Sequence, residues 1–229
     1  VLSLAEDTQH WERLLGSSGG KLKFAKCGFY IMLWDFDEEG VASLKPSHNI
    51  PDMHLTSESS PTQTKIRQYD CQQSHTTLGV QITPSLQMKD AYKKLYTVGK
   101  KFGLRLLNSS LSKYDAWIAC FAVGLPSLTY TLPVTHHTEK KLSKIQVIPT
   151  KATLLKLGYN RNTSKKVVFG SQFYLGLGLR HLYVEQGIAQ INIIMRHIRA
   201  NTDHGTLTEI VLHWWQTNAG VSYSLLQNT

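Results

Sequence analysis

Cysteine is scarce in this sequence, and long apolar runs are absent. The three cysteines, Cys27, Cys71 and Cys120, are widely spaced and include no Cys-x-x-Cys pair. Their number and spacing argue against a disulfide framework or a cysteine zinc site, and favour reduced thiols. The apolar runs are far shorter than the roughly 20 residues that a membrane span needs, and no signal peptide is visible. We therefore expect an intracellular protein, nuclear or cytoplasmic, with no membrane partner.

Carboxylates are scarce too, but only in the later part of the chain. Residues 1–80 hold 7 Lys/Arg against 10 Asp/Glu, whereas residues 81–229 hold 18 against 6. The resulting net charges of −3 and +12 give the +9 of the whole chain. A basic region of this size favours a polyanionic partner, most simply nucleic acid. A basic surface without such a partner is the alternative.

Hydrophobic periodicity predicts an α+β protein with a small β-rich part at 1–82 and a mainly helical part at 83–229. In the β-rich part, a capping box of Ser3 and Glu6 begins a helix, with Leu4, Trp11 and Leu15 on its apolar face, and Gly16, Gly19 and Gly20 end it. Strands follow at 22–36 and 66–82. The stretch between them, 43–64, is rich in proline, serine and threonine and is predicted to be a polar loop.

The helical part begins with an amphipathic helix from Met88 to Leu106, with lysines on its polar face. A helix from Lys113 to Val123, capped by Ser112 and Asp115, is apolar on nearly all sides and is expected at the centre. The remaining predictions are a helix at 139–157 interrupted at Pro149, a helix at 184–199, and a last helix capped by Thr206 and Glu209 that ends in core residues Trp214-Trp215.

Several segments, taken in order, resemble the reverse transcriptases of retrotransposons. The first helix with Trp11–Leu15, the Gly19-Gly20 turn and Lys26-Cys27 are similar to motif D, which follows the catalytic centre. The segment with Leu78-Gly79-Val80 is similar to motif E, the primer grip. The basic helices beyond it resemble the thumb, and they are followed by a Gly-Leu-Gly segment, Tyr174–Leu179, and by Glu185-Gln186-Gly187. The resemblance implies a small antiparallel β palm remnant followed by a thumb-like helical region.

In that family, the intact enzyme is an RNA-directed DNA polymerase, a nucleotidyltransferase in which paired aspartates hold two Mg²⁺ ions. No Asp-Asp dipeptide occurs in this chain, which begins at Val1. We therefore expect the aspartates to precede Val1, in an N-terminal polymerase region that is missing here. The chain alone should contain no metal site or cofactor and should be inactive.

The resemblance also assigns roles to individual residues. Lys26 becomes the candidate general acid that protonates the leaving pyrophosphate, with Lys21 and Lys23 as rivals. Leu78, Gly79 and Val80 would place the primer, and an ordinary buried strand with a bulge is the alternative reading of these three. The cations that would follow the phosphates of a template–primer or RNA–DNA duplex, unless they form a merely solvated helix face, are Lys93, Lys94, Lys100, Lys101 and Arg105.

Further candidates carry weaker signals. A second basic set comprises Lys140, Lys141, Lys144, Lys165 and Lys166. His136-His137 with Glu139 lack a third ligand at metal-binding spacing, so a flexible loop is the better interpretation. The acids Asp37, Glu38 and Glu39 fit a turn that closes at Gly40.

The sequence thus predicts a fragment of a retroelement RNA-directed DNA polymerase that holds template–primer duplex without the catalytic aspartates. The alternative is a non-catalytic nucleic acid-binding or interaction remnant of a decayed or co-opted retroelement. A structural protein unrelated to polymerases would require that segments 22–36 and 66–82 not be adjacent strands of one sheet.

Overall fold

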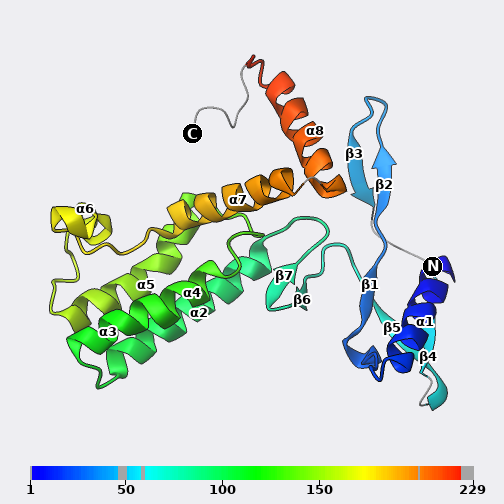
Figure 1. Ribbon diagram of the computed structural model, residues 1–229, viewed down its shortest axis with the longest axis horizontal. Coiled ribbons are helices and arrows are strands. Elements are labelled where there is room, and N and C mark those ends of the chain that lie inside the picture. Colours follow the sequence, from blue (N-terminus) through cyan, green and yellow to red (C-terminus); the bar gives the residue numbers. More distant parts are fainter. Residues whose placement is uncertain (1, 46–50, 58–59, 201, 223–229) are drawn as a thin grey trace. The chain divides into compact units, whose positions relative to one another are not determined.

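The computed structural model describes residues 2–45, 51–57, 60–200 and 202–222, which divide into two compact units, Val1–Asp90 and Ala91–Thr229 (Figure 1). Both helices and strands occur, which confirms the α+β class. Within the described residues every strand lies in the first unit, and the second unit is helical. No helix in these described stretches is long and apolar enough to cross a membrane.

The first unit is a three-stranded sheet beside one helix, with two separate hairpins. The strand order is β1-β5-β4, with β1 parallel and β4 antiparallel to β5. The sheet is therefore mixed, and the expectation of an antiparallel sheet is wrong for the pairing of β1 with β5. One hairpin is β2-β3 and the other is β6-β7. The elements are α1 (Leu2–Ser17), η1 (Phe24–Lys26), β1 (Gly28–Tyr30), β2 (Leu33–Phe36), β3 (Ala42–Lys45), β4 (Met53–Ser57), β5 (Ser60–Tyr69), β6 (His75–Thr77) and β7 (Val80–Ile82).

The core of the first unit lies on one face of this sheet. Alternate residues Met53 and Leu55 of β4 face it with Ile66 of β5 and Phe29 of β1, as the two-residue period of a strand requires. Gly28 pairs opposite Arg67, and a Cβ at Gly28 would lie 2.1 Å from the ring of Tyr69. Only glycine therefore lets this ring lie flat against β1.

Helix α1 contacts the sheet with a face that differs from the predicted one. Ala5 packs on the core, and the side-chain amide of Gln9 bonds to Thr56 of β4. Trp11 is 62% exposed, so its predicted role in the apolar face is wrong. The helix begins before Ser3, which excludes Ser3 as its cap. The predicted glycine stop is confirmed, since the Gly20 N–H donates to the Leu15 carbonyl at 2.7 Å and Gly19 has a φ of 81°.

Two predictions about the strands of this unit are wrong. The predicted strand 22–36 is divided, because residues 24–26 form a 3₁₀ turn and residues 31–32 separate β1 from β2, which belong to different sheets. The predicted loop 43–64 contains most of β3, all of β4 and part of β5; Pro46 lies outside the described residues. Threonine and serine favour loops locally, but pairing with β5 makes 53–57 a strand. The turn at Asp37–Gly40 is confirmed by the bond from the Gly40 N–H to the Asp37 carbonyl.

The second unit contains helices of very different length. Four of them, α2, α5, α7 and α8, have 20, 19, 18 and 16 residues. The elements are α2 (Lys89–Asn108), α3 (Lys113–Ala119), η2 (Cys120–Gly124), α4 (Leu125–Thr129), α5 (Glu139–Leu157), α6 (Lys165–Phe169), η3 (Gln172–Tyr174), α7 (Leu182–Arg199) and α8 (Asp203–Asn218).

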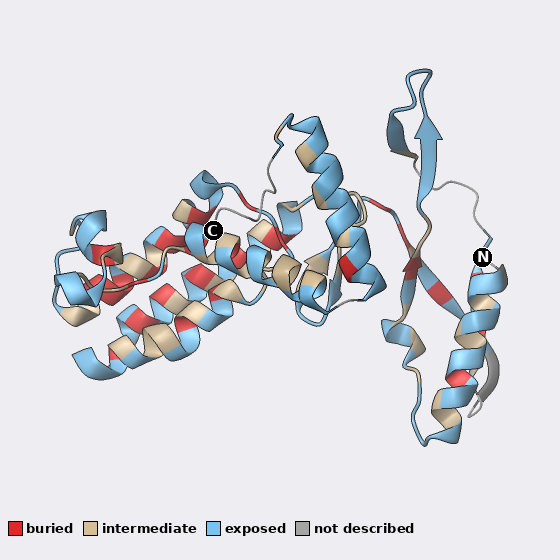
Figure 2. Ribbon diagram, turned by 45° about the horizontal axis from the view of Figure 1, so that its top comes forward, coloured by how far each residue is buried: buried red, intermediate tan, exposed pale blue. Residues whose placement is uncertain are grey.

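The main core of this unit is formed by leucines that α2, α4, α5 and α7 contribute. Figure 2 shows the buried residues along one side of these helices. Gly99 and Gly103 of α2 lie against Ile145 and Ile148 of α5, where an added Cβ would approach Ile148 within 2.9 Å. Glycines four residues apart therefore allow α2 and α5 to cross closely. The cluster comprises Leu95, Leu128, Leu132, Leu142, Ile145 and Leu182.

The predicted break at Pro149 is wrong, and helical structure also continues past Pro126. Helix α5 continues through Pro149, which is buried in a helix whose neighbouring turns bury Ile145 and Ala152. Beyond α3, a π-helical turn bonds the Leu125 N–H to the Cys120 carbonyl, and α4 then begins with Pro126 near its start. A proline lacks the N–H that helix continuation needs, but tertiary packing offsets that loss for Pro149, and the π turn accommodates it for Pro126.

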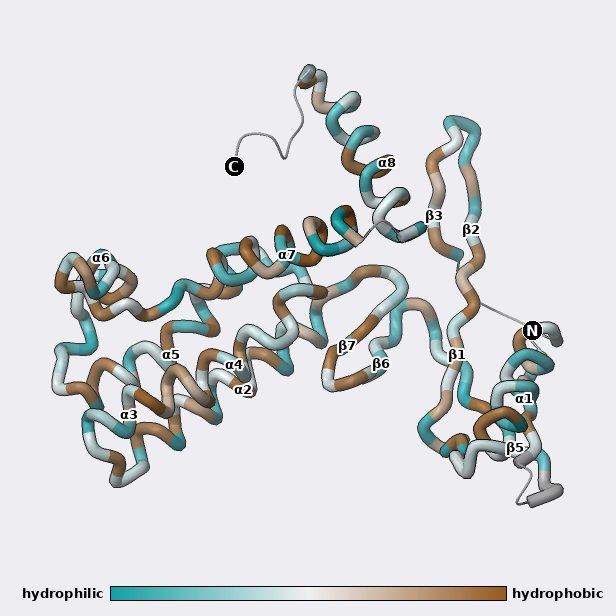
Figure 3. Tube along the Cα trace, viewed as in Figure 1, coloured by the Kyte–Doolittle hydropathy of each residue, from teal (hydrophilic) through white to brown (hydrophobic). Residues whose placement is uncertain are grey.

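The last helix also corrects the sequence analysis. The cap of α8 is Thr202, whose side chain accepts from the Gly205 N–H, and Thr206 lies inside the helix. Trp214 and Trp215 are 62% and 61% exposed, so they are not core residues. The hydropathy colouring in Figure 3 shows apolar positions recurring along α8. Ser112, by contrast, is confirmed as the cap of α3, since its hydroxyl accepts from the Asp115 N–H.

Candidate nucleic-acid interface

One face of α2 is basic and faces solvent. Lys93, Lys100, Lys101 and Arg105 are exposed, and Lys94 is half-buried. At 3.6 residues per turn these positions lie on the side opposite the buried residues of the helix. The spacing that buries one face thus leaves the cations on the other. The buried residues are Ala91, Leu95, Gly99, Gly103 and Leu106.

This basic face is long enough to follow several phosphates. Twelve residues separate Lys93 from Arg105, which is about 18 Å at a rise of about 1.5 Å per residue. A nucleic acid strand advances by about 3.4 Å per nucleotide, so the face spans roughly five steps. A row of exposed cations at this spacing can hold a duplex through its backbone without reading its sequence.

Carboxylates are too few in the second unit to neutralise its cations. Residues 91–229 hold 17 Lys/Arg and 5 Asp/Glu. Glu185 pairs with Arg180 at 3.4 Å, and Asp115 accepts from the Ser112 hydroxyl. Most of the positive charge is therefore available to an outside anion.

The second basic set divides into lysines that are exposed and one that contacts an aromatic ring. Lys140 and Lys144 are exposed on α5, and Lys151, seven residues after Lys144, continues the same stripe. Lys141 lies over the ring of Tyr92, with its Nζ 5.9 Å from the centroid. Lys156, which the sequence analysis did not single out, donates to the Ser109 carbonyl just after α2. The remaining pair, Lys165 and Lys166, is exposed on α6.

The candidate general acid lies in the first unit. Lys26 is the exposed last residue of the 3₁₀ turn η1, and not a residue of a strand as predicted. Lys21 and Lys23 are exposed as well. The turn is closed by the Cys27 N–H, which donates to the Phe24 carbonyl at 3.0 Å.

Leu78 and Gly79 form a turn, which corrects the prediction that they lie at the heart of a strand. They connect β6 to β7 as a two-residue loop between the paired residues Thr77 and Val80. Their φ angles are 49° and 85°, the positive pair that a type I′ hairpin requires. Leu78 is 86% exposed, so the alternative of a buried strand with a bulge is wrong too.

His137 is buried, which corrects its assignment to a flexible loop. Its side chain is 1% exposed, and its main-chain N–H and carbonyl both bond to the side chain of Gln186 at 3.0 Å. Burial, helped by the charge of Lys141, lowers the pKa of His137 to about 4. His137 does lie in the loop between α4 and α5, but its neutral imidazole is buried against the helices. Over the described residues, no group of three or more His, Cys, Asp or Glu side chains could hold a metal ion.

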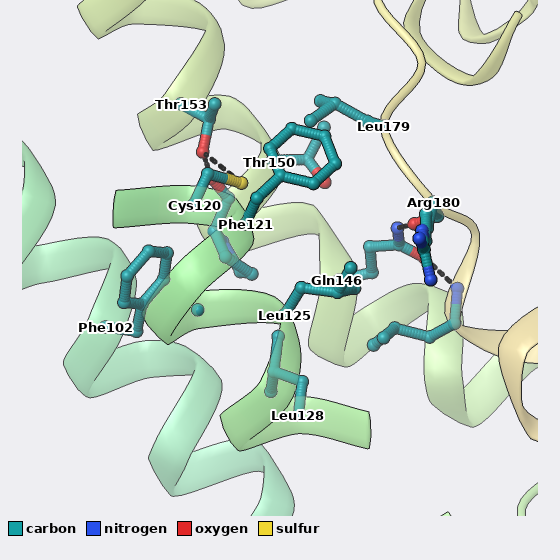
Figure 4. Close-up of a pocket in the computed structure, with 13 residues that line it drawn as sticks. Phe102, Cys120, Phe121, Leu125, Leu128, Gln146, Thr150, Thr153, Leu179 and Arg180 are labelled. Carbon is teal, nitrogen blue, oxygen red and sulfur yellow. Dashed lines mark hydrogen bonds between the residues drawn. The ribbon is translucent and has the colours of Figure 1, made fainter. Parts of the chain in front are cut away.

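A small cavity lies beside the π-helical turn (Figure 4). Phe102, Phe121, Leu125, Leu128 and Leu179 line it, and its volume is about 40 Å³. Thr153 donates to the sulfur of Cys120 at 3.6 Å, and burial raises the pKa of that thiol. A space of this size accommodates a few water molecules and no substrate. It is therefore a packing gap beside an irregular turn.

A larger cavity of about 360 Å³ lies between α5 and the segment 161–169. Lys151, Arg161 and Lys165 line it together with His181. Sequence reasoning placed Lys165 in a basic set but missed the other three, because only the fold brings the segment after α5 back against this helix.

Comparison with known proteins identified no relative. No protein-family model matches the chain, and no curated protein and no solved structure is similar to it.

Proposed function

We propose that this chain is part of the RNA-directed DNA polymerase of a retrotransposon, and that its helical unit holds the template–primer duplex. The observation that carries the proposal is the basic face of α2, in a unit with 17 cations against 5 carboxylates. The resemblance of the segments around Lys26 and Leu78 to motifs D and E gives the polymerase context.

The pairing of β1 with β5 bears on one alternative, although the two strands are parallel where the resemblance implies an antiparallel sheet. Gly28, Phe29 and Tyr30 pair with Arg67, Gln68 and Tyr69. Segments 22–36 and 66–82 therefore supply adjacent strands of one sheet, whereas a structural protein unrelated to polymerases would require them to be apart.

In this proposal each part of the chain has a separate task. The cations of α2 neutralise phosphates, which positions the duplex without regard to its sequence. Lys26, exposed at the end of η1, supplies a proton to pyrophosphate in the intact enzyme. The catalytic aspartates and their Mg²⁺ ions belong to a region before Val1, and the chain alone does not polymerise.

Binding to an RNA–DNA hybrid, measured by fluorescence anisotropy from low to high salt, tests the duplex-holding role. Each phosphate contact contributes about −0.9 to the slope of log affinity against log salt. The double variant Lys100→Gln/Lys101→Gln should make that slope shallower by about 2 units. The matched control Lys21→Gln/Lys23→Gln removes the same charge from the first unit and should leave the slope unchanged. Equal effects of the two variants, or affinity independent of salt, would contradict the proposal.

A non-catalytic nucleic acid-binding remnant of a retroelement is the second candidate. It is favoured by the absence of an Asp-Asp dipeptide from the chain. Sequencing the transcript upstream of the Val1 codon distinguishes the two candidates. A strand-turn-strand with an aromatic-x-Asp-Asp motif supports the polymerase, and a transcript without it supports the remnant.

A further inference from the structure

The 360 Å³ cavity beside α5 has a basic lining. One wall is α5, with Ser143, Thr150 and Lys151, and the other is the segment with Arg161 and Lys165. None of the described residues that line it is acidic. The side chains of Lys151, Arg161 and Lys165 form neither ion pairs nor hydrogen bonds within the described part of the chain. Three unneutralised cations thus border one hollow.

The wall that carries His181 is fixed before any ligand arrives. The side-chain amide of Gln146 donates to the Arg180 carbonyl at 2.6 Å and accepts from the Leu182 N–H at 3.0 Å. These bonds clamp the main chain on both sides of His181. The His181 ring also lies edge-on to Phe169, with 5.0 Å between the centroids. A site held in this way loses little conformational entropy on binding.

The lining combines a histidine that has an unsatisfied nitrogen with an apolar floor. The Nδ1 of His181 is buried and has no hydrogen-bond partner among the described residues. The floor of the cavity is apolar, because Leu154 and Val168 are both buried there. Cations at the rim and an apolar floor together match a ligand with an anionic end and an uncharged body.

We propose that this cavity binds a phosphate monoester of about mononucleotide size. A phosphate monoester carries close to two negative charges and three strong acceptor oxygens. It can therefore pair with several cations at once, whereas a carboxylate pairs with fewer. The volume falls within the range of small-molecule sites. The site is separate from the basic face of α2, so it does not depend on duplex holding.

Isothermal titration of the full chain with AMP, adenosine and inorganic phosphate tests the site. AMP should bind with a Kd below about 1 mM, and adenosine should bind at least about tenfold more weakly. Arg161→Gln/Lys165→Gln should weaken AMP binding by about tenfold or more. The matched control Lys140→Gln/Lys144→Gln removes the same charge outside the cavity and should have little effect. Adenosine binding as tightly as AMP, or equal losses in the two variants, would overturn the proposal.

Three further measurements identify the source of the phosphate, test the site without a variant that could misfold, and separate it from the basic face of α2. A 5′-phosphorylated oligonucleotide that binds more tightly than its 5′-hydroxyl form assigns the site to a strand end, and AMP binding alone assigns it to free nucleotides. Imidazole NMR signals of His181, but not of His197, should shift when AMP is added to the unmodified chain; an unmoved His181 contradicts the site. Lys100→Gln/Lys101→Gln should leave AMP binding intact, which separates this site from the duplex-binding face.

Discussion

The two units balance their charges differently. The first unit holds 8 Lys/Arg and 11 Asp/Glu. Two of its lysines pair with nearby aspartates: Lys45 with Asp35 at 2.8 Å and Lys65 with Asp52 at 2.6 Å. The second unit holds 17 against 5 and has no such balance. The difference teaches that the excess positive charge of the chain resides in the helical unit.

The two units also differ in how deeply they bury a glutamine side chain that bonds to the main chain. In each unit the side-chain amide of a glutamine hydrogen-bonds to both the main-chain N–H and the main-chain carbonyl of one residue. Gln9 bonds to Thr56 in this way, and Gln186 bonds to His137. Gln9 is half-buried at the edge of β4, whereas Gln186 is buried among helices. Solvent can replace the first set of bonds far more easily than the second.

The largest predicted effect comes from removing these amides. Gln186→Leu leaves a buried N–H and a buried carbonyl without partners, so it should lower the free energy of unfolding by about 2–4 kcal/mol. Gln9→Leu should cost about 1 kcal/mol, since water reaches the edge of the sheet. Urea unfolding of both variants measures the difference. Equal costs would show that the two sites are equally buried in solution.

The second prediction concerns pH and the helical unit alone. Burial holds the pKa of His137 near 4, below the ordinary value of 6.5, so the unfolded chain takes up a proton first as pH falls. Stability is therefore full above pH 6.5 and declines between 6.5 and 4, by about 2 kcal/mol from pH 7 to pH 5. His137→Leu should abolish this decline, and His213→Gln should retain it. Urea unfolding at the two pH values checks both, and a decline that persists in His137→Leu would assign it to other groups.

The third prediction tests the tight packing of the helical unit. At Gly124 an added Cβ would lie 2.4 Å from the ring of Phe102, while at Gly187 nothing lies within 4 Å. Gly124→Ala should lower stability by about 1 kcal/mol, because overpacking outweighs the gain in helix propensity. Gly187→Ala should raise stability by about 0.5–1 kcal/mol. Thermal unfolding measures the Tm of both variants. A change of Tm in the same direction for both would contradict the predicted difference in packing.

The smallest expected effect concerns the β6-β7 hairpin of the first unit. Leu78 has a φ of 49°, a conformation that asparagine tolerates and leucine does not. Leu78→Asn should therefore stabilise the β6-β7 hairpin by about 0.5–1 kcal/mol. Hydrogen exchange of the β6 and β7 amides measures this gain. Faster exchange in the variant would mean that the leucine side chain stabilises the hairpin by more than its positive φ destabilises it.

Some features followed from local sequence, because their cause is local. The α2 helix and its basic face depend on the spacing of Ala91, Leu95 and Leu106 against the lysines, which tertiary contacts do not alter. The glycine stop after α1 and the turn at Asp37–Gly40 depend on neighbouring residues alone. Charge asymmetry is a property of composition and is fixed before folding.

Other features depended on partners distant in the chain. Pro149 remains helical since its neighbours are buried against other helices, and residues 53–57 are a strand since β5 pairs with them. His137 is buried by Gln186, which is 49 residues away. The hollow with Arg161 and His181 exists because Gln146 clamps a later segment onto α5. The sequence by itself determined where the helices and charges lie, and only the tertiary structure decided which of these side chains meet, because burial and close approach depend on residues that lie far apart in the chain.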